Sequence, residues 1–169
     1  MSPDYTALCL AGLCLAGLLL FVAQFRVVRE YQRLVVFRIG RFVGARGPGL
    51  VMVLPLFDRG VRVDLRETTM PLRGVRLASQ DGTTVKADLA VSYRITEAAK
   101  SVLAASDPVR SLEARAVAGL RSLVEGSSYA DLLIRQGWMA TELRSQLQEI
   151  VAGWGIEVTS LDIQDIRKG

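Results

Sequence analysis

The residue types that most often carry out catalysis are scarce in this sequence. The chain has no histidine, which is the usual general base and metal ligand. Its two cysteines, Cys9 and Cys14, lie five residues apart in an uncharged apolar run, so they do not share a helix face. No GxSxG, P-loop or GxGxxG motif is present. We therefore predict a protein that is not an enzyme and that has no catalytic, cofactor-binding or metal-binding residues.

The remaining candidates for chemistry have simpler explanations. Ser79, Ser101 and Lys100 could in principle supply a serine–lysine pair, but no motif surrounds them. Asp81 stands in the stretch QDGTTV, where an aspartate before glycine is typical of a turn. The other acidic residues occur singly, mostly on the polar faces of predicted strands and helices, where solvated surface positions explain them.

The composition indicates contact with a membrane. Half of the residues are hydrophobic, and residues 6–25, TALCLAGLCLAGLLLFVAQF, contain no charge. Twenty helical residues span roughly 30 Å, the thickness of a bilayer's hydrocarbon core. We predict that residues 1–25 form a transmembrane anchor helix. The alternative is a cleaved signal peptide, which would favour basic residues at the start, whereas the chain begins MSPDY.

The charges on either side of this run are unequal. Asp4 is the only charged residue before it, whereas six arginines and one acid, Glu30, follow within about twenty residues. The positive-inside rule then places the following domain on the cytoplasmic side of the cell membrane, as a single-pass or monotopic protein. We predict that five of these residues contact anionic lipid, namely Arg26, Arg29, Arg33, Arg41 and Arg46. The bases are not interleaved with exposed aromatic residues and no known nucleic-acid-binding motif appears, so we predict no nucleic-acid binding.

Strand patterns dominate the first part of the chain after residue 25. Alternating apolar residues predict strands over residues 34–41, 60–66 and 83–95, with turns at 44–49 and 80–82. The last of these strands has one strictly apolar face, which is typical of an antiparallel sheet with one side on the core.

Helical spacing replaces alternation after residue 106. Asp107 and Pro108 are typical of a helix start, Val109, Leu112, Ala116, Leu120 and Leu123 form an apolar stripe, and Gly126 predicts the end. Ser128 is predicted to cap a short helix over 129–135, and another helix is predicted over 139–152, with Leu143, Leu147, Ile150 and Val151 on one side. A closing strand over 156–166 changes its apolar phase, so a β-bulge is expected near residues 159–160. This order predicts an α+β fold, mostly antiparallel sheet with packed helices.

Several of these segments, taken together, resemble one known family. REYQRLVVFRIGRFVGARGPGLVMVLPLFDRGVRVDLR, DGTTVKADLAVSYRI, AVAGLRSLVEGSSYADLL and WGIEVTSLDIQDI occur in the order found in the stomatin/prohibitin/flotillin family, whose shared domain is called SPFH or band 7. The chain is most similar to the bacterial slipin or stomatin-like subgroup. The resemblance implies an SPFH domain over residues 26–166 and a short tail over 167–169, without the family's coiled coil.

The same resemblance suggests a role for the apolar run after GPG. In this family the first part of the domain lies against the membrane. The run is therefore expected to insert shallowly, with membrane contact by Leu50, Val51, Met52, Val53, Leu54, Leu56 and Phe57. The alternative is an ordinary buried strand that ends at Pro55.

The function implied by the resemblance is that of a scaffold. We expect a homo-oligomer that organises or regulates membrane proteins and local lipid, with an NfeD-type membrane protein or a membrane protease as a partner. The alternatives are a lipid-surface adaptor that does not self-assemble and a secreted or periplasmic binding domain.

Overall fold

A computed structural model describes residues 9–10, 12–15, 25–54, 57–104 and 107–169 of the chain. The chain divides into two compact units, one up to Val63 and one from Asp64 onward. Most of the predicted anchor lies outside the described residues. Its described residues 9–10 and 12–15 are helical, whereas Phe25 already lies in a strand, so the helix predicted through residue 25 is wrong at its last residue. Among the described residues, no helix combines the length and the apolar character that crossing a bilayer requires.

The first unit is built from five short strands. They are β1 (Phe25–Val28), β2 (Gln32–Arg38), β3 (Arg41–Arg46), β4 (Gly49–Met52) and β5 (Asp58–Asp64). Strands β1 and β4 form a two-stranded antiparallel ribbon, and a second sheet has the order β3-β2-β5. A small core of five aliphatic side chains holds this unit together, namely Val28, Leu34, Val36, Val51 and Val53.

The strand predicted over residues 34–41 is wrong at its end, because the chain turns there. Ile39 and Gly40 both have positive φ, 50° and 76°, and they join β2 to β3 as a two-residue hairpin turn. Such turns need positive φ at both central residues, which glycine adopts freely and isoleucine rarely does. Because isoleucine is unusual at such a position, the sequence pattern did not indicate a turn at Ile39. The turn predicted over 44–49 is shorter, because β3 continues to Arg46 and β4 begins at Gly49.

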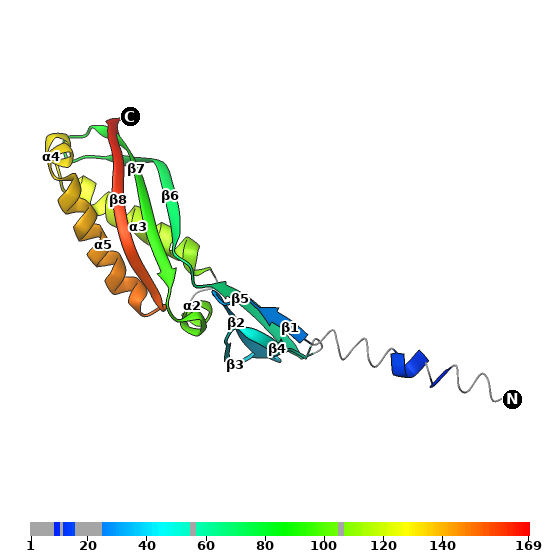
Figure 1. Cartoon of the computed structure of the whole chain (residues 1–169). Helices are drawn as coiled ribbons and strands as arrows, with labels where there is room; N and C mark the ends of the chain where they lie inside the picture. The colour runs from blue at the N-terminus through cyan, green and yellow to red at the C-terminus, as the bar shows by residue number, and fades with distance from the viewer. Residues whose placement is uncertain (1–8, 11, 16–24, 55–56, 105–106) are drawn as a thin grey trace. The chain divides into compact units, whose positions relative to one another are not determined.

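The second unit packs helices on a three-stranded antiparallel sheet, as the α+β prediction implied. The sheet order is β6-β7-β8, and Figure 1 shows α3 and α5 running along one face. The elements are β6 (Thr68–Ala78), β7 (Thr84–Ile95), α2 (Ala98–Ala104), α3 (Pro108–Glu125), α4 (Tyr129–Ile134), α5 (Gln136–Ala152) and β8 (Ile156–Lys168).

The core of the second unit follows the predicted patterns. The apolar face of β7 is buried against the helices, and Val85 and Val91 have no exposed surface. The stripe on α3 is buried as well, with Leu112 and Leu120 fully enclosed. The predicted helix start is confirmed, because the Asp107 carboxylate accepts a hydrogen bond from the Arg110 backbone N–H at 3.0 Å.

Two elements of the second unit were not predicted, β6 and α2. Strand β6 contains Pro71 and Gly74, which weaken a strand pattern in the sequence, yet an edge strand accommodates both. One prediction on α5 is wrong, because Ile150 is 42% exposed rather than on the buried side.

The predicted bulge in the closing strand is confirmed. Thr159 is the extra residue between the pairs Val158–Tyr93 and Ser160–Ser92. A second shift, unpredicted, leaves Gln164 as an extra residue, and β8 continues through Lys168, past the predicted domain end.

Candidate membrane-contact surface

The β1–β4 ribbon has an exposed face made only of apolar side chains. In its antiparallel register Phe25 lies opposite Met52, and Val27 lies opposite Leu50. Directly opposed residues project to the same side, as do residues two apart on one strand, so these four side chains share a face. Their exposed fractions are 36%, 45%, 71% and 67%, respectively. We call these four residues the ribbon face.

The other face of the ribbon carries two buried residues and the exposed Arg26, which lies opposite Val51. Val28 and Val51 lie in the core of the first unit and are 3% and 6% exposed. Alternation along the strands thus divides the apolar sequence into an inner and an outer set.

The structure separates the seven residues predicted to contact the membrane. Leu50, Met52 and Phe57 are exposed, at 67%, 45% and 56%. Val51 and Val53 are buried core residues, and Leu54 is only partly exposed. The alternative of a buried strand is therefore right for Val51 and Val53, whereas membrane contact by the exposed residues stays a prediction. A strand with one face on a core presents every second residue outward. Leu56 lies outside the described residues.

A second exposed apolar group lies around the β2–β3 turn. Ile39 is 78% exposed, and its backbone N–H donates to the carbonyl oxygen of Phe57 at 3.0 Å. Phe42 and Val43 on β3 are 42% and 48% exposed, and the Phe42 ring packs edge-on against Phe37 at 6.1 Å. The hydrogen bond ties the hairpin turn to the end of the apolar run. Ile39 and Phe57 are therefore held near each other, and we call them the hairpin tip.

An ion pair fixes this arrangement. The Arg38 guanidinium donates two hydrogen bonds to the Asp58 carboxylate, at 2.8 and 3.1 Å, and the Leu54 backbone N–H donates a third at 3.2 Å. The Asp58 side chain is only 2% exposed. The bonds from Arg38 hold the pKa of Asp58 below its ordinary value, and the Leu54 N–H acts in the same direction against the effect of burial. No pattern in the sequence links these partners, which lie 20 residues apart.

The five arginines predicted to contact lipid differ in their surroundings. Arg26, Arg29, Arg41 and Arg46 are exposed. Arg33 is only partly exposed, and its guanidinium donates to the carbonyl oxygens of Glu30 and Gln32 at 3.1 Å. Arg33 therefore stabilises the turn between β1 and β2.

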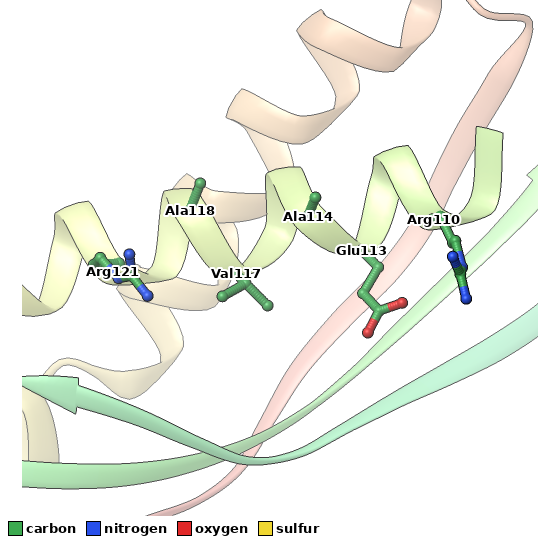
Figure 2. Close-up of a pocket in the computed structure, with 6 residues that line it drawn as sticks. All are labelled: Arg110, Glu113, Ala114, Val117, Ala118 and Arg121. Atoms are coloured by element: carbon green, nitrogen blue, oxygen red, sulfur yellow. The ribbon is translucent and has the colours of Figure 1, made fainter. Parts of the chain in front are cut away.

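One surface hollow of the second unit lies on a single helix. It has a volume of about 590 Å³, and its six lining residues, drawn in Figure 2, all come from α3, namely Arg110, Glu113, Ala114, Val117, Ala118 and Arg121. Within the part of the chain that the structure describes, no group of three or more histidine, cysteine, aspartate or glutamate residues could hold a metal ion.

Asp81 has a structural role that the sequence pattern only half indicated. It lies in the predicted turn, but its carboxylate also accepts a hydrogen bond from the Tyr129 backbone N–H at 2.9 Å. Asp81 and Ser128 thus both satisfy free amides at the start of α4.

Comparison with known proteins agrees with this architecture. The chain is 31% identical over 150 residues to a stomatin homolog of Pyrococcus horikoshii, covering 88% of this chain and 56% of the relative. It is 32% identical over 144 residues to Stomatin-4 of Caenorhabditis elegans, covering 84% and 51%. It is 33% identical over 144 residues to Mechanosensory protein 2 of the same organism, covering 84% and 30%.

The chain therefore spans only about a third to three fifths of the length of such relatives. The family profile described as "SPFH domain / Band 7 family" matches residues 26–168, which cover the five-stranded unit from Arg26 onward and the α+β unit through Lys168. This chain belongs to the SPFH domain / Band 7 family.

Proposed function

We propose that this protein is a non-enzymatic, membrane-anchored scaffold that contacts lipid through the ribbon face and the hairpin tip. The observation that carries the proposal is the ribbon face itself. Four large apolar side chains project together from a two-stranded ribbon that begins at Phe25, the last residue of the uncharged apolar run of residues 6–25. A contiguous exposed apolar surface at this point favours insertion into the membrane interface.

The exposed apolar area of the ribbon face is large enough to contribute measurably to membrane binding. The exposed fractions of the four side chains add up to roughly two fully exposed large apolar side chains. Burying that much apolar surface stabilises membrane contact by about 3–6 kcal/mol, taken as an upper estimate because interfacial insertion is shallow. Each exposed arginine near anionic headgroups adds about 1 kcal/mol. Arg26, Arg29, Arg41 and Arg46 are our candidates for that contact.

The topology follows from the charge pattern. The residues before Phe25 would form the anchor, and the strands and helices from β1 to β8 would form the membrane-adjacent domain, as a single-pass or monotopic protein. The arginines after the anchor favour the cytoplasmic side.

The scaffold role rests on the family. Relatives carry the names stomatin homolog, Stomatin-4 and Mechanosensory protein 2. We propose that this chain self-associates at the membrane and organises or regulates membrane proteins and nearby lipid. An NfeD-type membrane protein or a membrane protease is the kind of partner we expect. If the chain does not self-associate, the alternative function is that of an adaptor that binds the lipid surface without self-assembly.

The test measures depth in the bilayer for single positions of the full chain. In a Cys9→Ser/Cys14→Ser background, Val27→Cys and Leu50→Cys are each labelled with a bimane fluorophore, and the protein is reconstituted into vesicles of phosphatidylcholine and phosphatidylglycerol. Lipids brominated on the acyl chain near the headgroup should quench both labels, because both side chains would lie in the interface.

The matched control is Ile134→Cys, labelled in the same way. Ile134 is 83% exposed on α4 of the second unit, so it resembles Leu50 in chemistry and exposure but lies outside the proposed surface. The proposal requires much stronger quenching at positions 27 and 50 than at 134. Equal quenching at all three positions, or none at 27 and 50, would overturn lipid contact by the ribbon face.

A further inference from the structure

The sheet of the second unit has two edge strands, and they are unlike each other. In the order β6-β7-β8, each outer strand has one side without a neighbour in the sheet. Gly169 donates its backbone N–H to the Thr84 carbonyl at 2.9 Å, and Ser79 donates to the Thr83 carbonyl at 3.0 Å. Along β7, even-numbered residues therefore turn their backbone groups toward β8, and odd-numbered residues turn theirs toward β6.

The free edge of β6 is protected against pairing. Pro71 lies opposite Ala90, an even-numbered residue, so the backbone nitrogen of Pro71 is on the free edge, where proline has no hydrogen to donate. A register shift follows between Leu72 and Val75, with Gly74 at φ 65°. Proline and bulges are both devices that keep a sheet edge from adding another strand.

The free edge of β8 is protected only near its start. Val158 lies opposite Tyr93, so its backbone groups turn outward. They are covered by α5, because the Val158 N–H donates to the Gln148 side-chain oxygen at 2.7 Å and the Arg144 guanidinium donates to the Val158 carbonyl at 3.3 Å.

Four later residues of β8 turn outward in the same way. Each lies opposite an odd-numbered residue of β7, and they are Leu161, Ile163, Ile166 and Lys168. Among the described residues, no hydrogen bond outside the ladder reaches their backbone groups. The segment contains no proline. We call these four residues the open edge.

We propose that the open edge pairs antiparallel with the open edge of a second copy of this chain, with Leu161 opposite Lys168 and Ile163 opposite Ile166 across a twofold axis. This inference deepens the proposed self-association and rests on it. All four outward residues then have outward partners, as an antiparallel ladder requires. If this register is shifted by two residues in either direction, two of the four outward-facing residues of each copy no longer lie opposite an outward-facing residue.

The side chains agree with the same register. Leu161 and Ile166 are buried on the helix-covered face, and Ile163 packs against the same core. Asp162 and Arg167 are exposed residues of the other face. The register places Asp162 opposite Arg167 of the second copy, twice by symmetry. Opposite charges directly across two strands attract, whereas a shift of two residues would place Asp162 opposite Asp165.

The surface beside the open edge has room for another strand end. A hollow of about 290 Å³ lies between α5 and β8, lined by Gly137, Ala140, Thr141 and Arg144 and by residues 159–162. Gly137 and Ala140 have small side chains, so α5 leaves space on this side of the hollow. In the proposed register Gly169 of the second copy, which follows Lys168, would lie opposite Ser160, beside this hollow.

The first experiment uses a cysteine pair in the full chain, with Cys9 and Cys14 replaced by serine. Asp162→Cys and Arg167→Cys are introduced together. Across the proposed axis these positions form a close pair without ladder hydrogen bonds, with Cα atoms about 4.5 Å apart, which suits a disulfide. Within one chain they are separated by about 16 Å of strand, so they cannot bridge internally. Mild oxidation should give a disulfide-linked dimer on a non-reducing gel.

The control is Asp162→Cys alone. In the proposed dimer its two copies lie about 16 Å apart, so little linked dimer should form. Equal crosslinking of the single and double variants would overturn the register.

The second experiment exchanges the charges. Asp162→Arg should weaken dimerisation about tenfold, because it sets two arginines against each other at two symmetric places. The double variant Asp162→Arg/Arg167→Asp should restore it in part, because Arg167 also pairs with Asp88 and Asp165 of its own chain, at 3.2 and 3.4 Å. Light scattering over a concentration series in detergent measures both. Unchanged association in Asp162→Arg, or no recovery in the double variant, would overturn the interface.

The results also separate this inference from the scaffold itself. If the wild-type chain is oligomeric but the cysteine pair does not link, the scaffold proposal stands and the open edge is not its interface. If the wild-type chain is monomeric at every concentration and in membranes, self-association and the open-edge interface both fail.

Discussion

A single methyl group at Gly155 should destabilise the second unit strongly. Gly155 connects α5 to β8 with φ at 65°, a region that side chains other than glycine's rarely adopt. A Cβ atom added there would lie 2.7 Å from the Glu97 Cβ and 2.8 Å from the Glu97 carbonyl oxygen. The Gly155 carbonyl oxygen also accepts hydrogen bonds from the backbone N–H groups of Thr96 and Glu97, at 2.9 and 3.1 Å. This turn is therefore held on several sides and cannot easily move away.

The size of the effect follows from these contacts. The left-handed conformation costs an alanine about 1–2 kcal/mol, and forcing an extra carbon into a packed site costs about 1–3 kcal/mol. Gly155→Ala should therefore lower the free energy of unfolding by about 2–5 kcal/mol. For a unit of this size the melting temperature should fall by roughly 10–20 °C.

Gly153→Ala is the matched control, two residues earlier. Gly153 has φ at −64°, and an added Cβ would meet nothing within 4 Å. Alanine should be neutral there or should stabilise by up to about 1 kcal/mol, because it reduces the freedom of the unfolded chain. Both variants are melted in parallel by circular dichroism. Equal melting temperatures for the two variants would refute the argument from backbone strain and close contact.

Two further predictions concern packing and pH. An added Cβ at Gly119 on α3 would lie 2.6 Å from the Leu143 Cδ1 atom, whereas Gly137 on α5 has open space. Urea unfolding should therefore find Gly119→Ala less stable than Gly137→Ala by about 1–3 kcal/mol, and equal stabilities would contradict the close packing of α3 on α5. The pKa of Asp58 is lowered by Arg38, so its contribution to stability is present above the unfolded-state pKa and is lost as the pH falls through the folded-state pKa. Asp58→Asn should be less stable than the wild type near pH 7, and the difference should shrink on acidification below about pH 4; a constant difference would argue against the ion pair as its cause.

The strongest sequence predictions came from residues whose neighbours in sequence are also their neighbours in structure. The start of α3 at Asp107 and Pro108 is an example, because a cap bonds to an amide three residues away. The bulge at Thr159 is another, because alternation of side chains along a strand is a local property and its interruption is visible in one chain. Long periodic segments such as β7 and α3 were predicted for the same reason.

The predictions from the sequence failed where a residue adopts a backbone conformation or a secondary structure that its type rarely adopts. Ile39 occupies a positive-φ turn position that glycine or asparagine normally fills. Pro71 and Gly74 lie inside a strand, which is possible only because β6 is an edge. In both places the tertiary fold overrode the local preference.

For the candidate surface, the sequence by itself determined that an apolar run and a group of arginines follow an uncharged stretch long enough to cross a bilayer. It also determined, through the ordered segments between residues 30 and 166, the family to which the chain belongs. Composition and order along the chain are sufficient for these conclusions, because they depend on no contact between distant residues.

Only the tertiary structure decided which apolar side chains remain outside. The run from residue 50 reads as uniformly hydrophobic, yet Leu50 is exposed and Val51 is buried. The difference depends on pairing with β1 and on the core beneath the ribbon, which together set the direction of every second side chain. The ion pair between Arg38 and Asp58 also depends on the tertiary structure. The two residues are far apart along the chain, and they pair because folding buries the Asp58 carboxylate and places the Arg38 guanidinium beside it.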